Sequence, residues 1–302
     1  MTLKAKSGSV LAIGVFDGLH KGHMKLLNTA KKLAGKNGFA VMTFNPHPTF
    51  VLKGKTQASK LIFSPQERVK KLQLIGANKI RLQKFDKNFA NKSPENFIKF
   101  LKKLLPDLKY IVVGENFRFG KNASGNIDWL KTNAERFGIV PVSVKGVKVG
   151  GQFASATRLR TALQNGDLKT FEKIANARYT ACGVVEKGAQ LGRKLGFATL
   201  NIKHAPQCMP KFGVYITKVL SQKSKKEYFA VSNYGVKPSV GNAKVPLIES
   251  HILGKTRLGY GSEIRVEFVK FLRGEKKFKN LDELKDAIAK DVCAAKKYWK
   301  IK

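Results

Sequence analysis

Acidic side chains are scarce in this chain. The 302 residues hold 20 Asp and Glu against 58 Lys and Arg, which gives a formal net charge of +38. Such an excess indicates either a nucleic-acid or anionic-membrane partner, or a lysine-rich solvated surface. The lysines are spread along the whole chain instead of forming one arm, which favours the solvated surface. We therefore expect no specific nucleic-acid partner, with non-specific polyanion binding at low salt.

Cysteine and long apolar runs are scarce as well. Cys182, Cys208 and Cys293 stand apart with no C-x-x-C spacing, which argues against a structural zinc site and fits a reducing compartment. No apolar run approaches the length of a membrane span. Residues 1–8 lack the apolar core of a signal peptide. We expect a soluble cytoplasmic protein that does not bind membranes.

The length and the apolar content favour two folded domains. At 302 residues the chain is long for one domain, and 43% hydrophobic residues are enough for real cores. Up to about residue 165, apolar runs alternate with helical patterns, which predicts a parallel sheet wrapped by helices. One predicted helix begins after Ser64 and has Val69, Leu72, Leu74 and Ile75 as its apolar residues. The predicted strands are Val10–Val15, Phe39–Phe44, Lys79–Leu82, Tyr110–Val113 and Ile139–Val142.

After about Tyr179 short β-rich runs follow one another, separated by loops rich in Gly, Pro and Lys. This pattern predicts an antiparallel barrel or sandwich. Asn280 begins a last helical pattern, and residues 165–178 form a helical connector between the halves. The runs are Thr180–Val185, Gly213–Leu220, Tyr228–Val231, Pro246–Leu253 and Glu263–Phe271.

A motif near the N-terminus carries two histidines at a helix start. The segment Gly14–His23 reads GVFDGLHKGH, follows the apolar run Val10–Ile13 and precedes a helical pattern. The free N–H groups and the dipole of a helix start attract phosphate. His20 and His23 can add side-chain donors, and Gly22 permits a close approach. We interpret the motif as a site for a nucleoside triphosphate and not for a metal. The alternative is a histidine pair that merely caps the helix.

Further motifs follow in order along nearly the whole chain. They are Phe16–His23, Thr43–Pro48, Gly114–Gly120, Ser155–Arg160, Gly192–Asn201, Gly213–Tyr215, Glu249–His251 and Phe271–Phe278. As an ordered set they resemble the bacterial bifunctional riboflavin kinase/FAD synthetase family. The first motif is similar to that family's version of the nucleotidyltransferase HxGH signature.

The resemblance implies a Rossmann-like α/β nucleotidyltransferase domain, followed by a mostly-β six-stranded flavokinase barrel with a C-terminal helix. It places an FMN adenylyltransferase domain at residues 1–165, a helical connector at 166–178 and a riboflavin kinase domain at 179–302. It implies that ATP phosphorylates riboflavin to FMN and that a second ATP adenylylates FMN to FAD, with Mg²⁺ as cofactor. The expected partners are these small molecules, for a monomer or weak homo-oligomer.

In the first half the resemblance implies phosphate and flavin contacts. His20 and His23 would donate to the ATP phosphates as negative charge builds, and Arg158 would add a guanidinium fork. The other predicted ATP-binding residues are Gly14, Phe16, Asp17, Gly18, Gly22, Ser155, Thr157 and Arg160. The predicted flavin-binding residues are Asn45, His47, Asn116, Phe117 and Phe119. Core packing is the alternative for the two phenylalanines, and a solvated helix face for the two arginines.

In the second half the resemblance implies a kinase site. Glu249 would be the general base for the riboflavin hydroxyl, although strand alternation could simply point it to solvent. Thr199 and Asn201 offer oxygens on one strand face for Mg²⁺ bridged to ATP. The other predicted ATP-binding residues are Gly188, Arg193 and Gly196. For the two glycines the alternative is a glycine that only permits a turn.

Several positions depart from the family pattern. Ala198 stands where proline is usual and Ala156 where serine is usual, and Gly235–Ser239 is a loosened version of a family loop. Acidic residues usual after the Glu249 strand are absent. Two alternatives to the full pair of reactions follow: a chain that retains only one activity, or a basic nucleic-acid-binding protein on this scaffold.

Overall fold

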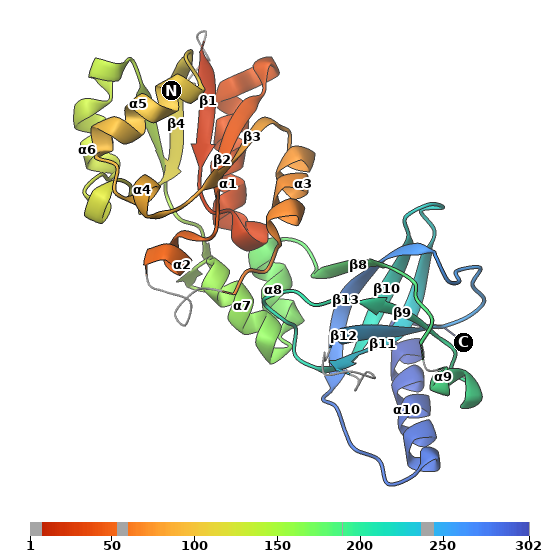
Figure 1. The fold of residues 1–302 in the computed structure, drawn as a ribbon. Helices are drawn as coiled ribbons and strands as arrows, with labels where there is room; N and C mark the ends of the chain where they lie inside the picture. Colours follow the sequence, from red (N-terminus) through yellow and green to blue (C-terminus); the bar gives the residue numbers. More distant parts are fainter. Residues whose placement is uncertain (1–7, 53–59, 189, 237–244, 302) are drawn as a thin grey trace. The chain divides into compact units, whose positions relative to one another are not determined.

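The computed structural model describes residues 8–52, 60–188, 190–236 and 245–301. The chain divides into two compact units, Met1–Ala156 and Thr157–Lys302 (Figure 1). The predicted domain limits at 165 and 178 stay predictions. Two sequence-based statements lie outside the described residues: the lack of a signal peptide in the first seven residues and the altered loop at 237–239.

The first unit is built on a five-stranded sheet. The strand order is β3-β2-β1-β4-β5, and every neighbouring pair is parallel. This confirms the predicted parallel sheet. The strands are β1 (Ser9–Ile13), β2 (Phe39–Asn45), β3 (Ala77–Lys84), β4 (Leu108–Gly114) and β5 (Val140–Val144). A small hairpin, β6 (Lys148–Val149) and β7 (Gln152–Phe153), follows.

Helices cover this sheet on both faces. Alternate residues of β1 enter two different cores: Leu11 and Ile13 pack with α5 and α6, whereas Val10 and Ala12 pack with α1 and α3. Because both faces are covered, the central strands β1, β2 and β4 read as nearly continuous apolar runs. The helices are α1 (Lys21–Ala34), α2 (Pro48–Leu52), α3 (Pro65–Ile75), α4 (Lys87–Ala90), α5 (Pro94–Leu104) and α6 (Ile127–Asn133).

The buried face of α3 differs from the predicted one. The capping box formed by Ser64 and Glu67 is present, so the helix begins where expected. Leu74 is 88% exposed, however, while Arg68 is fully buried at the position one turn before Leu72. The prediction for Leu74 was wrong because the face that meets the sheet runs through positions 68, 72 and 75, in steps of four and three.

The second unit is a six-stranded antiparallel sheet with the order β8-β13-β10-β11-β12-β9. Its two edge strands meet, since the backbone N–H of Glu186 donates to the carbonyl of Asn201 at 2.9 Å. The sheet therefore forms a barrel, which confirms the predicted fold class and decides between barrel and sandwich. The strands are β8 (Thr180–Val184), β9 (Thr199–Lys203), β10 (Gly213–Ser221), β11 (Glu227–Val236), β12 (Pro246–Ile252) and β13 (Glu263–Arg273).

A long C-terminal helix packs on this barrel. Asp291 of this helix accepts from Arg273 of β13 in a bidentate ion pair: Nη2 donates to Oδ2 at 2.7 Å and Nε donates to Oδ1 at 3.0 Å. Trp299 stacks on Phe229 of β11 with ring centroids 4.2 Å apart. Asn280 caps the helix start, as predicted. The helices of this unit are α7 (Ala156–Asn165), α8 (Leu168–Ala175), α9 (Leu191–Lys194) and α10 (Leu281–Trp299).

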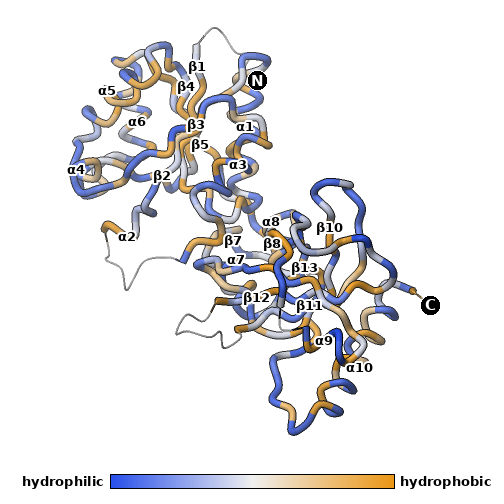
Figure 2. The backbone as a smooth tube through the Cα atoms, turned by 45° about the vertical axis from the view of Figure 1, so that its right-hand side comes forward, coloured by the Kyte–Doolittle hydropathy of each residue, from blue (hydrophilic) through white to orange (hydrophobic). Residues whose placement is uncertain are grey.

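Hydrophilic segments, blue in Figure 2, occur throughout both units. In each unit they alternate with the apolar segments that form the cores. In the described part of the chain, no helix combines the length and the apolar composition that a membrane crossing requires.

The Arg273–Asp291 pair generates a prediction about stability. Replacing Asp291 by Ala should lower the free energy of unfolding of the second unit by about 2 to 3 kcal/mol, because a largely buried guanidinium loses its partner. Urea unfolding followed by Trp299 fluorescence, with Trp129 replaced by Phe, measures this. Asp286→Ala, an exposed site on the same helix, is the matched control and should cost less than about 0.5 kcal/mol. Equal losses for the two variants would contradict the expectation.

Candidate functional site

The first unit contains a cavity of about 350 Å³ at the carboxyl ends of β1 and β4. Parallel sheets place ligands at this end, where the loops leave the strands. The wall combines the turn after β1, the start of α1 and the residues that follow β4. The side chains and glycines that matter chemically are Gly14, His20, Gly22, His23, Asn116 and Ser155.

The two histidines of this cavity stack on each other. Their ring centroids are 3.7 Å apart, with the ring planes 25° from parallel. His20 is the N-cap of α1, and its Nδ1 accepts from the backbone N–H of His23 at 3.4 Å. The proton of a neutral His20 ring therefore lies on Nε2, which can donate to a ligand. The helix-cap alternative and the ligand-donor interpretation are thus compatible.

Burial keeps both imidazoles neutral. It lowers the pKa of His20 from 6.5 to about 4. Burial also lowers the pKa of His23 well below 6.5, and the neighbouring His20 and Arg68 add to this effect. At neutral pH the pair consequently acts through N–H groups and not through a full positive charge.

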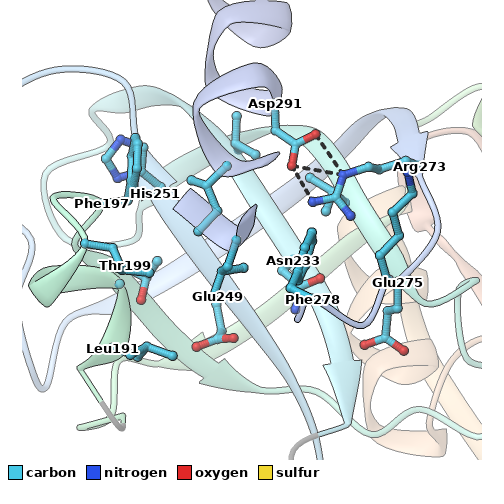
Figure 3. Close-up of a pocket in the computed structure, with 17 residues that line it drawn as sticks. Leu191, Phe197, Thr199, Asn233, Glu249, His251, Arg273, Glu275, Phe278 and Asp291 are labelled. Atoms are coloured by element: carbon cyan, nitrogen blue, oxygen red, sulfur yellow. Dashed lines mark hydrogen bonds and ion pairs between the residues drawn. The ribbon is translucent and has the colours of Figure 1, made fainter. Parts of the chain in front are cut away.

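The second unit contains a cavity of about 300 Å³ between the barrel and α10 (Figure 3). Its wall holds Thr199, Asn233, Glu249, His251, Glu275 and the Arg273–Asp291 pair. Figure 3 shows the carboxylates of Glu249 and Glu275 pointing to the same side of the pocket. In a chain with so few acids, two carboxylates facing one cavity are a distinctive feature.

Strand register brings the polar residues of this pocket together. Glu249 of β12 pairs with Asn233 of β11 on one side and with Asn201 of β9 on the other. Two residues along, His251 pairs with Thr199. Since side chains two apart share a strand face, these groups lie on one face of the sheet.

The chemistry of this donor set fits a magnesium ion. Asn201 is 7% exposed, and its Oδ1 is buried without a hydrogen-bond partner. A buried amide oxygen without a donor is costly unless a ligand completes it. Thr199 offers a second neutral oxygen from the same face of β9. Magnesium needs few protein ligands when substrate phosphates supply the rest.

Comparison with known proteins covers both units. A family model described as FAD synthetase matches residues 2–158, and one described as riboflavin kinase matches residues 175–299. The chain is 32% identical to the bifunctional riboflavin kinase/FMN adenylyltransferase of Haemophilus influenzae, over 97% of this chain and 94% of that protein. The chain belongs to this bifunctional family.

Two further known proteins also match nearly the whole of this chain. The Bacillus subtilis member of the bifunctional riboflavin kinase/FMN adenylyltransferase family is 32% identical over 96% of this chain and 92% of its own length. A crystal structure from Streptococcus pneumoniae, named as a macrolide-efflux protein, superposes with a TM-score of 0.84 at 29% identity and covers 97% of this chain. The resemblance inferred from the motifs is confirmed at the level of the family.

Some residues of the family motif after β1 line the cavity, and others are buried in the turn behind it. Gly14, Phe16 and Gly22 line the cavity, as predicted for ATP-binding residues. Asp17 is buried and does not line it, and Gly18 lies beside Asp17 in the buried turn. The Asp17 carboxylate accepts from backbone N–H groups outside the motif, so we assign it to holding the turn and not to touching ATP.

Of the predicted flavin-binding residues, some line the first cavity and others do not. Asn116 and Phe117 line the first cavity. Phe119 is 7% exposed and packs on Phe97 and Trp129, as the core-packing alternative expects. Phe119 is not among the residues that line the cavity, although it stacks on Phe117, and its flavin-binding role stays a prediction.

The remaining flavin and phosphate residues lie outside the cavity wall. Asn45 is exposed at the end of β2, and His47 accepts from the backbone N–H of Thr49 at 3.1 Å. Neither residue is among those that line the first cavity. Thr157, Arg158 and Arg160 lie on α7, which continues directly from Ser155 of the cavity wall, and Arg160 donates to Thr157 at 3.1 Å. Their roles toward ATP stay predictions.

In the kinase half, the glycine-rich segment contains the short helix α9. Gly192 lines the second cavity, whereas Gly188, Arg193 and Gly196 do not. Gly188 lies against the Asn201 side chain: a Cβ there would come within 2.6 Å of the amide nitrogen. Glycine at this position therefore makes room for the amide that we assign to the metal site.

Several residues of the two sites were missed from the sequence. The Arg273–Asp291 pair and Glu275 line the kinase cavity, and Phe153 and Glu115 line the first one. Glu275 lies in the quoted motif after β13, and an acid in a chain this basic was the available signal. Glu115 follows β4 directly, where strand-end chemistry is expected.

The low histidine pKa in the first cavity generates a pH prediction. Between pH 6.5 and 4 the unfolded chain binds a proton at His20 that the folded chain does not, so stability falls as the pH is lowered through this window. His20→Asn keeps a helix cap but removes the titrating ring. Going from pH 7.5 to 5, the variant should lose roughly 2 kcal/mol less stability than wild type.

Urea unfolding at the two pH values measures this, with Trp129 fluorescence in a Trp299→Phe background reporting on the first unit. A variant whose pH dependence equals that of wild type would show that His20 is not held neutral by burial.

Proposed function

We propose that this chain converts riboflavin to FMN in the second unit and FMN to FAD in the first, with one ATP consumed in each reaction. The observation that carries the proposal is that one chain spans both family regions and has a separate cavity in each, with imidazole donors in one and a carboxylate in the other. The substrates are small molecules. Three isolated cysteines support a cytoplasmic location.

In the second unit the reaction is phosphoryl transfer. Glu249 removes the proton of the riboflavin 5′-hydroxyl, and the hydroxyl oxygen attacks the γ-phosphorus of ATP. The bond from that phosphorus to the β-phosphate oxygen then breaks. The products are FMN and ADP. The position of Glu249 supports this role, because its strand pairs it with Asn201 and Asn233 and it lines the cavity of this unit.

Magnesium completes the kinase site in this proposal. Asn201 and Thr199 would hold it, and the bound ion would supply positive charge to the ATP phosphates. The buried, unpartnered Oδ1 of Asn201 is the support for this assignment. The chain's own residues then orient the amide: Gly188 leaves space beside it, and the Asn201 backbone is fixed by pairing with Glu249 and Glu186.

In the first unit the reaction is adenylyl transfer. A phosphate oxygen of FMN attacks the α-phosphorus of a second ATP, and the bond from that phosphorus to the β-phosphate oxygen breaks to release pyrophosphate. His20 and His23 donate hydrogen bonds to the phosphate oxygens as negative charge accumulates on the leaving group. Neutral imidazoles suit this role, since donors fixed in a buried site need no reorganisation during the reaction.

One assay tests the proposal. Purified protein is incubated with riboflavin, ATP and Mg²⁺, and the flavins are separated by chromatography. The proposal expects FMN and then FAD to accumulate. FMN alone, or FAD only when FMN is supplied, identifies a chain with one activity. Folded protein that forms neither product overturns the proposal.

His23→Ala should stop FAD formation and spare FMN formation. Loss of one preorganised donor to a developing negative charge costs about 10² to 10³ in kcat. The rates of the two reactions are measured separately, with FMN or riboflavin as the supplied flavin. Gln73→Ala, at an exposed position of α3 outside the cavity wall, is the comparison variant; a defect as large as that of His23→Ala would argue that the cavity is not the site of adenylyl transfer.

Glu249→Gln should have the opposite effect. The amide cannot accept the hydroxyl proton, so FMN formation should fall about 10² to 10⁴-fold, while FAD formation from supplied FMN continues at the wild-type rate. Glu263→Gln, an exposed carboxylate at the start of β13, is the matched control. Retained kinase activity in Glu249→Gln would exclude this carboxylate as the base.

A further inference from the structure

Arg68 is a fully buried cation that the reactions described above do not use. It lies in the first turns of α3, and its side chain is 0% exposed. Its Nη1 donates to the carbonyl oxygen of Val15 at 3.1 Å, and its Nη2 donates to that of Phe44 at 2.7 Å. Burying a guanidinium costs free energy that an apolar side chain of similar size would not. What it supplies at this position is the pair of hydrogen bonds to the backbone, together with a positive charge near the buried carboxylate of Asp17.

The first of these bonds fixes the turn that carries the histidines. Val15 follows the end of β1, and its carbonyl also accepts from the Thr43 hydroxyl at 2.8 Å. The next residue, Phe16, has φ of 56°, a left-handed conformation that is unfavourable for a non-glycine residue and persists only where its surroundings impose it. The Phe16 ring meets the His23 ring edge to face at 5.3 Å. Holding the Val15 carbonyl thus sets the position of His23 through Phe16.

The second bond fixes the end of the neighbouring strand. Phe44 directly precedes Asn45, the last residue of β2, and the segment of Asn45 and His47 is where we expect the flavin. The helix that carries Arg68 is itself tied to the histidine loop: the Asp17 carboxylate accepts from the backbone N–H groups of Ile62 and Phe63 at 3.0 and 3.2 Å. One guanidinium thus links the ends of β1 and β2, which are neighbours in the sheet (Figure 1).

We propose that Arg68 is a positioning residue for adenylyl transfer, which holds the ATP-phosphate loop after β1 in register with the segment after β2. It touches neither substrate. An in-line attack of the FMN phosphate on the α-phosphorus requires both substrates to be aligned, and an error of about 1 Å can cost about 10²-fold in rate. This inference rests on the proposed function, because it concerns the geometry of that reaction.

The test compares Arg68→Met and Arg68→Lys with Leu72→Ala in the full chain. Leu72 is also 0% exposed and lies one turn further along α3, but it makes no bond to either strand end. For each variant we would measure kcat and KM for ATP and FMN in FAD formation, the rate of riboflavin phosphorylation, and unfolding by Trp129 fluorescence. The kinase rate is an internal control, because that reaction takes place in the other unit.

The inference expects a loss confined to kcat. Arg68→Met should lower kcat for FAD about 10- to 100-fold, with KM for ATP and FMN within about threefold and the kinase rate unchanged. Arg68→Lys, which keeps the charge but has no fork to reach both carbonyls, should lie between Arg68→Met and wild type. Leu72→Ala should keep kcat within about threefold even where it destabilises the unit as much as Arg68→Met, since its cost is a cavity.

Two results would overturn the inference: a wild-type kcat in Arg68→Lys and Arg68→Met, or an equal loss of kcat in Leu72→Ala at equal stability. If Arg68→Met does not fold, the comparison of Arg68→Lys with Leu72→Ala decides. Wild-type protein that forms no FAD would instead refute the proposed function. The two failures are therefore distinguishable.

Discussion

Burial of the parallel sheet on both faces is the constraint on which the first unit depends. With α1 and α3 on one face and α5 and α6 on the other, the central strands β1, β2 and β4 have almost no exposed surface on which chemistry could be built. Polar groups can then contact a ligand only where the strands end. The imidazole pair, Asn116 and Ser155 all lie there. The buried polar residues Thr43 and Arg68 serve the same end of the sheet, because backbone carbonyls that leave the ladder need new donors.

In the second unit the cavity lies outside the barrel, because side chains fill the barrel interior. These side chains are aromatic and aliphatic, with buried hydroxyls such as Thr217 and Ser232 bonded to each other. The ligand site therefore lies between the barrel and α10, and antiparallel register brings polar residues from three strands to one place. The Arg273–Asp291 pair keeps the helix against the barrel and so closes the cavity.

The sequence was sufficient for most of the fold and for the local parts of each site. Continuous apolar runs revealed the parallel strands, and the Ser64 capping box located the start of α3. Strand β9 was not among the predicted runs, although its alternating apolar and polar residues are typical of a strand and Thr199 and Asn201 were placed on one strand face. Contacts distant in sequence were invisible: nothing local shows that Arg68 points inward, that Asp291 pairs with Arg273, or that Phe117 lines the cavity while Phe119 enters the core. These outcomes depend on which helix face meets the sheet, which only tertiary packing decides.

Asn201 has two structural duties whose combination has a dynamic consequence. Its main chain forms the seam between the edge strands β8 and β9, and its side-chain oxygen is buried beside that seam without a hydrogen-bond partner. Seams between edge strands are where barrels breathe most readily, because few ladder bonds must break. Each opening of this seam would also displace the amide. Local fraying of the barrel and displacement of this amide are then a single event, so the rigidity of the barrel rim also sets how well the amide is held in place.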